Sequence, residues 1–309
     1  MASVETPHQL AEQAVLKTLL YSDIFDFPLS RNELWEFLVT RKNIGKELFT
    51  QILDNLTASG QIFHMNGYFC IAGRKKIIDK RQENLPEVEK KLGIARKAAY
   101  YLSYIPTIKF IGISGGLAMY DVDAEDDIDF FIITKRKTLF MTRIWILGFL
   151  QFLKLRRVRS DKNPADKICV NYLIDEENLK FKKDKHDIYI AHEIAQVKPL
   201  FERENTGKKF FKTNQWIKQF FPNADTLIDT HILPRKTSAS NSFKFLGFIM
   251  NLRPVSSFLE WLQIRYIKRH QTIEMVSNHA IAFHPYDYRV QTLKELKLRF
   301  QQLGLLTKE

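Results

Sequence analysis

The sequence has few cysteines, few glycines and no long uninterrupted apolar run, and each shortage excludes a class of protein. Cys70 and Cys169 are the only cysteines among 309 residues, too few for a disulfide scaffold or a zinc framework. Each stands in an apolar, strand-like run, which predicts buried and reduced thiols. Twelve glycines and ten prolines exclude a collagen-like or low-complexity chain.

Segments that would direct the chain into or across a membrane are also missing. The longest apolar stretch, Leu139–Leu153, is interrupted by Thr142 and Arg143 and is shorter than a membrane span. The amino terminus lacks the basic region and apolar core of a signal peptide. We therefore expect a cytoplasmic protein with no membrane partner, long enough for two or three domains.

Charge is unevenly distributed along the chain. Of 47 basic and 35 acidic side chains, only five basic but eight acidic ones lie in residues 1–73. Residues 74–309 therefore hold 42 basic side chains against 27 acidic ones. A basic field of this kind attracts a triphosphate or a nucleic-acid backbone.

The most informative stretch runs from residue 108 to residue 134. The segments IKFIGI and IDFFIIT at its two ends have the apolar, β-branched composition of buried strands. Between them lie Gly115 and Gly116, whose bare backbone can approach a bulky anion, and then a group of acids. Asp127 and Asp129 are two residues apart at the start of the second strand, so both carboxylates are expected on one face. Paired carboxylates on a rigid edge suit Mg²⁺.

This pattern resembles the signature of a known superfamily. Gly-Gly-Leu-Ala, followed eleven residues after the second glycine by Asp-Ile-Asp in an apolar strand, resembles the polymerase-β-type nucleotidyltransferases. The resemblance implies that Gly115 and Gly116 contact the triphosphate of a nucleoside triphosphate, with Ser114 as an additional hydroxyl donor. It also implies that Asp127 and Asp129 hold two catalytic Mg²⁺ ions. The alternative is a glycine-rich turn beside a solvated acidic loop.

Residues 168–175 (ICVNYLID) are typical of a third buried strand. In the superfamily this strand normally carries a third carboxylate that helps one metal and activates the acceptor hydroxyl. Here the inward candidates are Asn171 and, on the same side of a period-2 strand, Asp175. An asparagine can ligate a metal but cannot accept a proton at neutral pH. Three alternatives stay open: two carboxylates suffice, Asp175 or a distant acid substitutes, or nucleotide is bound without turnover.

The first 73 residues have an organisation of their own. Helical periodicity over Leu10–Tyr21, a capping box at Ser30 and a third helix over Lys46–Ala58 precede a hairpin with an Asn66-Gly67 turn. Three helices and a hairpin resemble a winged helix-turn-helix domain. The third helix offers few cations, whereas DNA readers bring several to the phosphates. A protein partner is therefore the preferred prediction for this unit, and DNA binding is the less favoured one.

The rest of the chain is expected to be mainly helical. Residues 74–104 predict a helical connector broken at Pro86, with its many charges on a solvated face. His192-Glu193 superficially suggests a zinc-protease helix, but Gln196 stands where the second histidine is required. Residues 223–242 form the best linker candidate, and residues 281–289 could line an acceptor pocket or form an ordinary turn. Helices are expected over His186–Val197, Phe201–Phe221, Phe243–Arg269 and Tyr288–Leu303.

The sequence thus predicts an α+β protein. A winged-helix-like domain (1–73) and the connector (74–104) precede a nucleotidyltransferase-like core with a small mixed sheet (105–180) and a helical C-terminal region (181–309). The predicted function is transfer of a nucleoside monophosphate from a triphosphate to an unidentified acceptor, using Mg²⁺. Two alternatives are a catalytically silent nucleotide sensor acting through the winged helix and a nucleic-acid-binding regulator whose core is structural.

Overall fold

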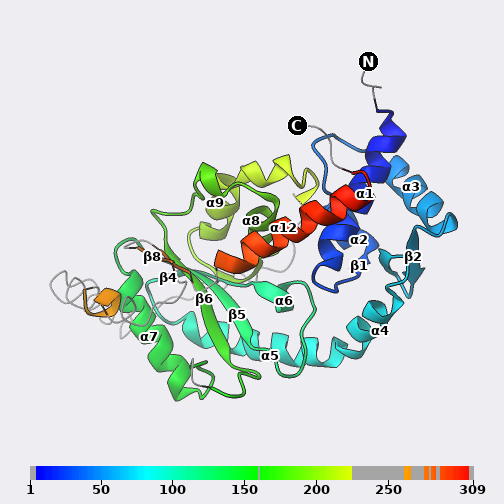
Figure 1. Ribbon diagram of the computed structural model, residues 1–309. Coiled ribbons are helices and arrows are strands. Elements are labelled where there is room, and N and C mark those ends of the chain that lie inside the picture. The colour runs from blue at the N-terminus through cyan, green and yellow to red at the C-terminus, as the bar shows by residue number, and fades with distance from the viewer. Residues whose placement is uncertain are drawn as a thin grey trace.

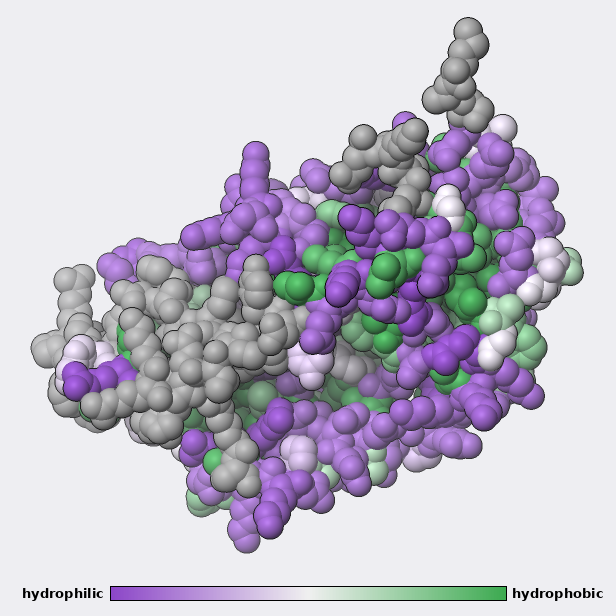
Figure 2. Space-filling view, in the orientation of Figure 1, coloured by the Kyte–Doolittle hydropathy of each residue, from purple (hydrophilic) through white to green (hydrophobic). Residues whose placement is uncertain are grey.

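The computed structural model shows a mixed α+β protein with two small sheets (Figure 1). None of the helices in the described part of the chain is long and apolar enough to cross a membrane. Figure 2 shows hydrophilic side chains over most of the face in view, with apolar surface exposed between them near the N-terminal helices. The structure describes residues 5–158, 161–224, 261–265, 275–277, 280–282 and 286–305.

The N-terminal unit follows the predicted order of elements. Capping boxes at Thr6 and Ser30 begin the first two helices, as local hydrogen bonding to the first-turn N–H groups favours. Asn66 and Gly67 both have positive φ angles, the geometry that a tight hairpin turn requires. The three strands pair in the order β1-β3-β2. The elements are α1 (Pro7–Asp23), β1 (Leu29–Ser30), α2 (Arg31–Glu36), α3 (Lys46–Ala58), β2 (Ile62–Met65) and β3 (Tyr68–Ile71).

Two helices connect this unit to the larger sheet, α4 (Lys75–Glu83) and α5 (Leu85–Leu102), with Pro86 in the first turn of α5 as predicted. The prediction that their charges form a solvated face is wrong for Arg81 and Lys91, which are 3% and 0% exposed. Both cations have oxygen partners in the interior: the two terminal nitrogens of Arg81 bind a carboxylate and backbone carbonyls, and Lys91 binds three oxygens.

The larger sheet has six strands in the order β7-β4-β5-β6-β9-β8. β5 and β6 are parallel, and the remaining neighbours are antiparallel. This mixed sheet carries the predicted strands at residues 108, 128 and 168. The strands are β4 (Ile108–Ile113), β5 (Ile128–Thr134), β6 (Ile168–Asp175), β7 (Lys198–Glu202), β8 (Met275–Ser277) and β9 (Ala280–Ala282).

Alternate residues of β5 enter two different cores. Phe130 and Ile132 pack on the side of α5 and α7 (Leu139–Phe152). Phe131 and Ile133 pack on the opposite side with α8 (Ile188–Ala195) and α9 (Thr206–Thr213), in a core that also takes in α1 and α3. The N-terminal unit therefore shares a hydrophobic core with the C-terminal half of the chain.

The sequence predicted a helical C-terminal region. This prediction is wrong in part, because the region supplies β7, β8 and β9 to the larger sheet. The predicted helix from residue 201 is wrong at its start, since Phe201 lies in β7. Pro199 is tolerated there because β7 is an edge strand. The predicted last helix is found as α12 (Tyr286–Gln302). Nearly all of the predicted linker (223–242) and most of the predicted helix 243–269 lie outside the described residues.

Candidate functional site

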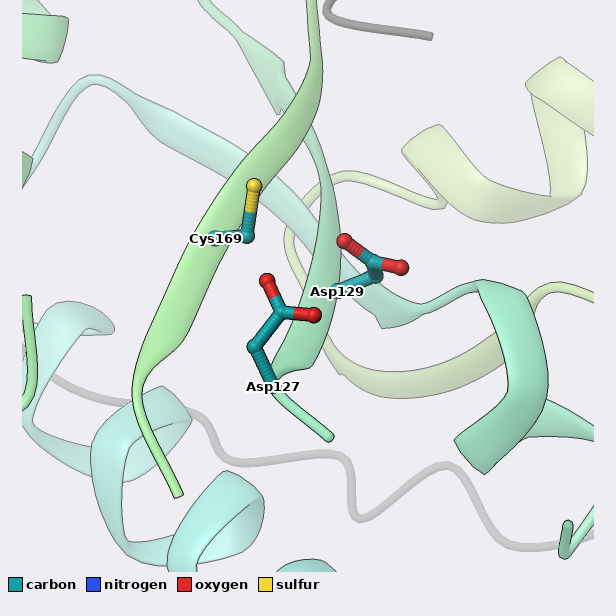
Figure 3. A group of neighbouring side chains, drawn as sticks. All are labelled: Asp127, Asp129 and Cys169. Carbon is teal, nitrogen blue, oxygen red and sulfur yellow. The ribbon is translucent and has the colours of Figure 1, made fainter. Parts of the chain in front are cut away.

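The predicted acid pair lies where β5 begins. Asp127 directly precedes the strand and Asp129 is its second residue, with the fully buried Ile128 between them pointing into the opposite core. One carboxylate oxygen of Asp127, one of Asp129 and the sulfur of Cys169 lie within 4.8 Å of one another. Figure 3 shows the three side chains in front of the neighbouring strands β5 and β6. The structure thus brings the two predicted carboxylates together.

The third strand contributes a different residue from those predicted. In the parallel pairing of β5 with β6, Asp129 is opposite Cys169, and a register shift after Phe130 leaves Asn171 at a β-bulge. Asp175 is opposite Thr134, five positions beyond Asp129 and so roughly 16 Å along the strand at about 3.3 Å per residue. The prediction that Asp175 could replace the third carboxylate is therefore wrong, because Asp175 lies too far along the strand from Asp129.

The two glycines are required by close contacts around the turn. Gly115 has φ +64°, and a Cβ atom built there would lie 2.6 Å from Asp129 Oδ2. A Cβ atom on Gly116 would lie 2.4 Å from the carbonyl oxygen of Asp121. Because real Cβ atoms do not approach this closely, only glycine allows the turn to pack against the acid pair. The turn forms the short helix α6 (Gly115–Ala118).

Ser114 introduces an unsatisfied polar group beside the turn. Its backbone N–H donates to the carbonyl oxygen of Asp129 at 3.0 Å, which fixes the end of β4 against β5. Its hydroxyl is buried and has no hydrogen-bond partner among the described residues. A buried hydroxyl without a partner is costly, so a ligand oxygen at this position would be stabilised.

An arginine from the basic loop after α7 neutralises part of the acid pair. The Arg157 guanidinium forms an ion pair with Asp127, and the Arg157 backbone N–H donates to the carbonyl oxygen of Ile168 at 3.2 Å. Burial disfavours the charged guanidinium, but Asp127 and Cys169 outweigh burial and raise the pKa of Arg157. Arg157 therefore supplies positive charge to the cluster without a metal.

Cys169 remains a neutral thiol next to the carboxylates. Burial raises its pKa to about 12, and the negative charges of Asp129 and Asp127 act in the same direction. The thiolate is the form that ligates metals, whereas Mg²⁺ prefers oxygen. A metal ion could be held by this cluster, in which the two carboxylates offer the oxygen ligands that Mg²⁺ prefers and the thiol would ligate only after losing its proton.

The acidic loop before β5 is fastened to the connector helices. Lys80 and Asn84 bind Asp123, with distances of 3.0 and 2.6 Å. Lys91 Nζ donates to the carbonyl oxygens of Ala124 and Asp126, at 3.1 and 2.7 Å, and to Asp166 at 2.9 Å. The loop is therefore braced where it leads into Asp127, although Ala124, Glu125 and Asp126 are exposed to solvent.

A pocket of about 210 Å³ lies beside the glycine turn. It is bounded by the end of α1 and the segment after it, by Gly115 and Gly116, and by α8. From α8 it receives His192 and Glu193, which the sequence analysis had considered only as part of a failed zinc motif. Burial lowers the pKa of His192 to about 4, so this imidazole is neutral.

The sequence contained a signal for one of the missed site residues. Period-2 alternation puts Cys169 on the same side of its strand as Asn171, but both cysteines had been assigned to the core. Cys70 is indeed buried, whereas Cys169 is half-buried in the cluster. Arg157 and His192 carry no local signal, because only the folded chain brings them to the site.

Comparison with known proteins adds no family to these observations. No family model matches the chain, and no curated protein matches it. The interpretation of the site therefore depends on its own geometry and chemistry.

Proposed function

We propose that this protein is a metal-dependent nucleotidyltransferase of the polymerase-β type. It would move a nucleoside monophosphate from a nucleoside triphosphate to an acceptor hydroxyl. The observation that supports this most strongly is the Asp127–Asp129 pair, whose carboxylates share one side of β5 and lie beside Gly115. The unsatisfied Ser114 hydroxyl at the same turn adds support, since phosphate oxygens are strong acceptors.

In this proposal each residue has a limited and separate task. Asp127 and Asp129 hold Mg²⁺, which when bound neutralises charge on the transferring phosphate. The backbone at Gly115 and Gly116, together with the Ser114 hydroxyl, orients the phosphate tail. The acceptor oxygen forms a bond to the α-phosphorus while the bond to the bridging oxygen breaks, and pyrophosphate leaves. The hydroxyl proton passes to solvent, since the amide of Asn171 cannot take it.

Arg157 has two roles in this scheme. In the metal-free protein it compensates Asp127, which lowers the repulsion between the two carboxylates. If Asp127 held a metal ion, the guanidinium would be free to turn to a phosphate oxygen, which its planar donors suit. Arg157 is thus a positioning residue whose loss is expected to alter nucleotide affinity.

The N-terminal unit is proposed to be a winged-helix-like module that contacts protein and not DNA. Its third helix carries Lys46 among the exposed side chains of one shallow face, together with Glu47 and Asp54. A nearly neutral to acidic face of this kind offers little to a phosphate backbone. The triphosphate, an acceptor and a protein partner are therefore the proposed ligands.

A second candidate function is a nucleotide sensor without turnover. The observation that favours it is the third strand, which presents Cys169 and Asn171 instead of a carboxylate. A protein of this kind would bind Mg²⁺ and a triphosphate but would release no pyrophosphate.

Calorimetric titration of the full chain with each of the four ribonucleoside triphosphates, with and without Mg²⁺, tests the shared part of both functions. We expect Mg²⁺-dependent binding that is lost in Asp127→Asn and in Asp129→Asn and kept in Glu125→Gln, a matched change in the same acidic loop. Binding that ignores both aspartate substitutions would overturn the proposal. Pyrophosphate release with candidate acceptors then separates the transferase from the sensor.

A further inference from the structure

The pocket beside the glycine turn has an aromatic wall. Tyr21, Phe25 and Phe27 line it from the end of α1 and the segment that follows. The ring centroids of Tyr21 and Phe25 are 5.5 Å apart, and Phe25 is 47% exposed although it is a large apolar side chain. Exposed aromatic rings at the edge of a cavity suit a ligand with an apolar body.

In the described part of the chain, two charged side chains line the pocket and both are acids, Asp121 from the loop after α6 and Glu193 from α8. Neither lysine nor arginine is found among the described residues that line it, although the whole chain has a net charge of +12. Glu193 accepts a hydrogen bond from the Gln196 amide at 2.8 Å, which orients the carboxylate.

Groups around the pocket do not reverse this negative charge. His192 is stacked on Phe37, with ring centroids 4.5 Å apart, and it is neutral because burial lowers its pKa. The two cations that act on Asp121 are already engaged, since Lys80 binds Asp123 and Arg81 binds Glu33. Burial raises the pKa of Asp121 to about 6, and the neutral imidazole and the two engaged cations leave two carboxylates as the charged groups that line the cavity in the described part of the chain.

Phe27 shows that this neighbourhood already stabilises a cation against an aromatic ring. The Arg81 guanidinium lies 4.2 Å from the centre of the Phe27 ring and 4.5 Å from that of Tyr68. Cations near aromatic faces are attracted by the ring quadrupole, and a nearby carboxylate adds to this attraction. An anionic group inside this pocket would instead meet the carboxylates of Asp121 and Glu193.

We propose that this pocket binds a small organic cation, an amine or quaternary ammonium attached to an apolar body. The aromatic wall receives the body, and Asp121 and Glu193 receive the positive charge. Because Gly115 and Gly116 form one side of the pocket and Gly115 abuts Asp129, the cation lies beside the proposed phosphate site. On the proposed function, which this step requires, such a cation is part of the acceptor.

The test is calorimetric titration of the full chain, free of Mg²⁺ and nucleotide, with benzyltrimethylammonium and with benzyl alcohol as an uncharged aromatic probe. We expect the cation to bind and the alcohol to bind at least about tenfold more weakly, the ratio that 1.4 kcal/mol produces. Glu193→Gln and Asp121→Asn should each reduce cation affinity about tenfold or more, and Glu125→Gln should leave it unchanged. Two separate acid variants with normal circular dichroism guard against loss of folding.

Three results would overturn the inference. They are equal binding of the two probes, cation binding that survives both acid substitutions, and binding of free nucleosides in place of the cation. The variant Asp127→Asn distinguishes this inference from the proposed function. It should abolish Mg²⁺-dependent triphosphate binding and leave cation binding intact. Triphosphate binding without cation binding would refute this inference alone, and the reverse result would refute the acid-pair proposal alone.

Discussion

Lys91 supports the acid pair from behind, and its removal should be measurable in both stability and binding. The side chain is fully buried, and its three ammonium protons are directed to three oxygens, two of them carbonyls of the loop that leads into Asp127. The substitution Lys91→Met keeps a side chain of similar length but removes the ammonium group that donates to these oxygens. The loop would then lose the contact that fixes the position of Asp127.

The expected cost follows from the exposure of the partner. Removing one member of a buried ion pair costs about 3–5 kcal/mol. Asp166 is 30% exposed and keeps its contact with Lys90 at 2.9 Å, which favours the lower end of that range. About 3 kcal/mol corresponds to a fall in melting temperature of roughly 5 °C for 309 residues, at about 2.1 cal/mol/K of unfolding entropy per residue. We also expect weaker Mg²⁺-dependent nucleotide binding at temperatures where the variant remains folded.

Lys90→Met is the matched control. Lys90 is the neighbouring lysine and binds the same carboxylate, but it is 48% exposed. Its replacement should change melting temperature and nucleotide affinity little, because solvent screens an exposed pair. Differential scanning calorimetry gives the melting temperatures of both variants, and titration gives their nucleotide affinities. Equal effects of the two substitutions would show that burial of Lys91 contributes nothing, and the reasoning would fail.

Two further predictions concern the glycine turn and the N-terminal unit. Gly115→Ala should reduce the free energy of unfolding by about 1–2 kcal/mol and abolish Mg²⁺-dependent nucleotide binding, because it adds a Cβ atom against Asp129. The control is Gly60→Ala, at a glycine with a similar positive φ and open space around it, which should reduce stability only. Calorimetry measures the stability of both variants, and titration measures their nucleotide binding. Burial disfavours ionised Glu33, but Arg81 outweighs it and lowers the pKa of Glu33 below 4.5. The stability from this pair is therefore present at neutral pH and lost as pH falls below 4.5 through the folded pKa. Melting temperatures measured down this range should fall more steeply for the natural protein than for Glu33→Gln, and parallel curves would contradict the prediction.

Local patterns in the sequence predicted the elements whose signals are themselves local. The bounds of α3 were predicted at Lys46 and Ala58 because apolar spacing and the following Gly60 define them within one segment. The pair Asp127 and Asp129 was predicted because alternation in a strand depends on the strand alone.

Features that depend on contacts between distant segments were not predictable in the same way. The bulge in β6 leaves Asn171 without a partner in the register and shifts the pairing of the residues that follow it, and no property of ICVNYLID alone predicts this. Arg157 reaches Asp127 from 30 positions further along the chain. From sequence alone, the end of β7 resembles the start of a helical, aromatic segment. It forms a strand because the edge of β4 is available to pair with it.

Arg81 joins the two parts of the molecule that both candidate functions require to communicate. Its guanidinium donates to the Glu33 carboxylate and to the carbonyl oxygen of Pro28 in the N-terminal unit, and at 3.3 Å to the carbonyl oxygen of Met119, which follows the glycine turn. A buried cation cannot lose one of these acceptors without a penalty of about 1–3 kcal/mol. Displacement of the turn by a ligand would therefore strain the contact that begins α2. In the proposed nucleotide sensor, this strain would carry the signal from the glycine turn to the N-terminal unit.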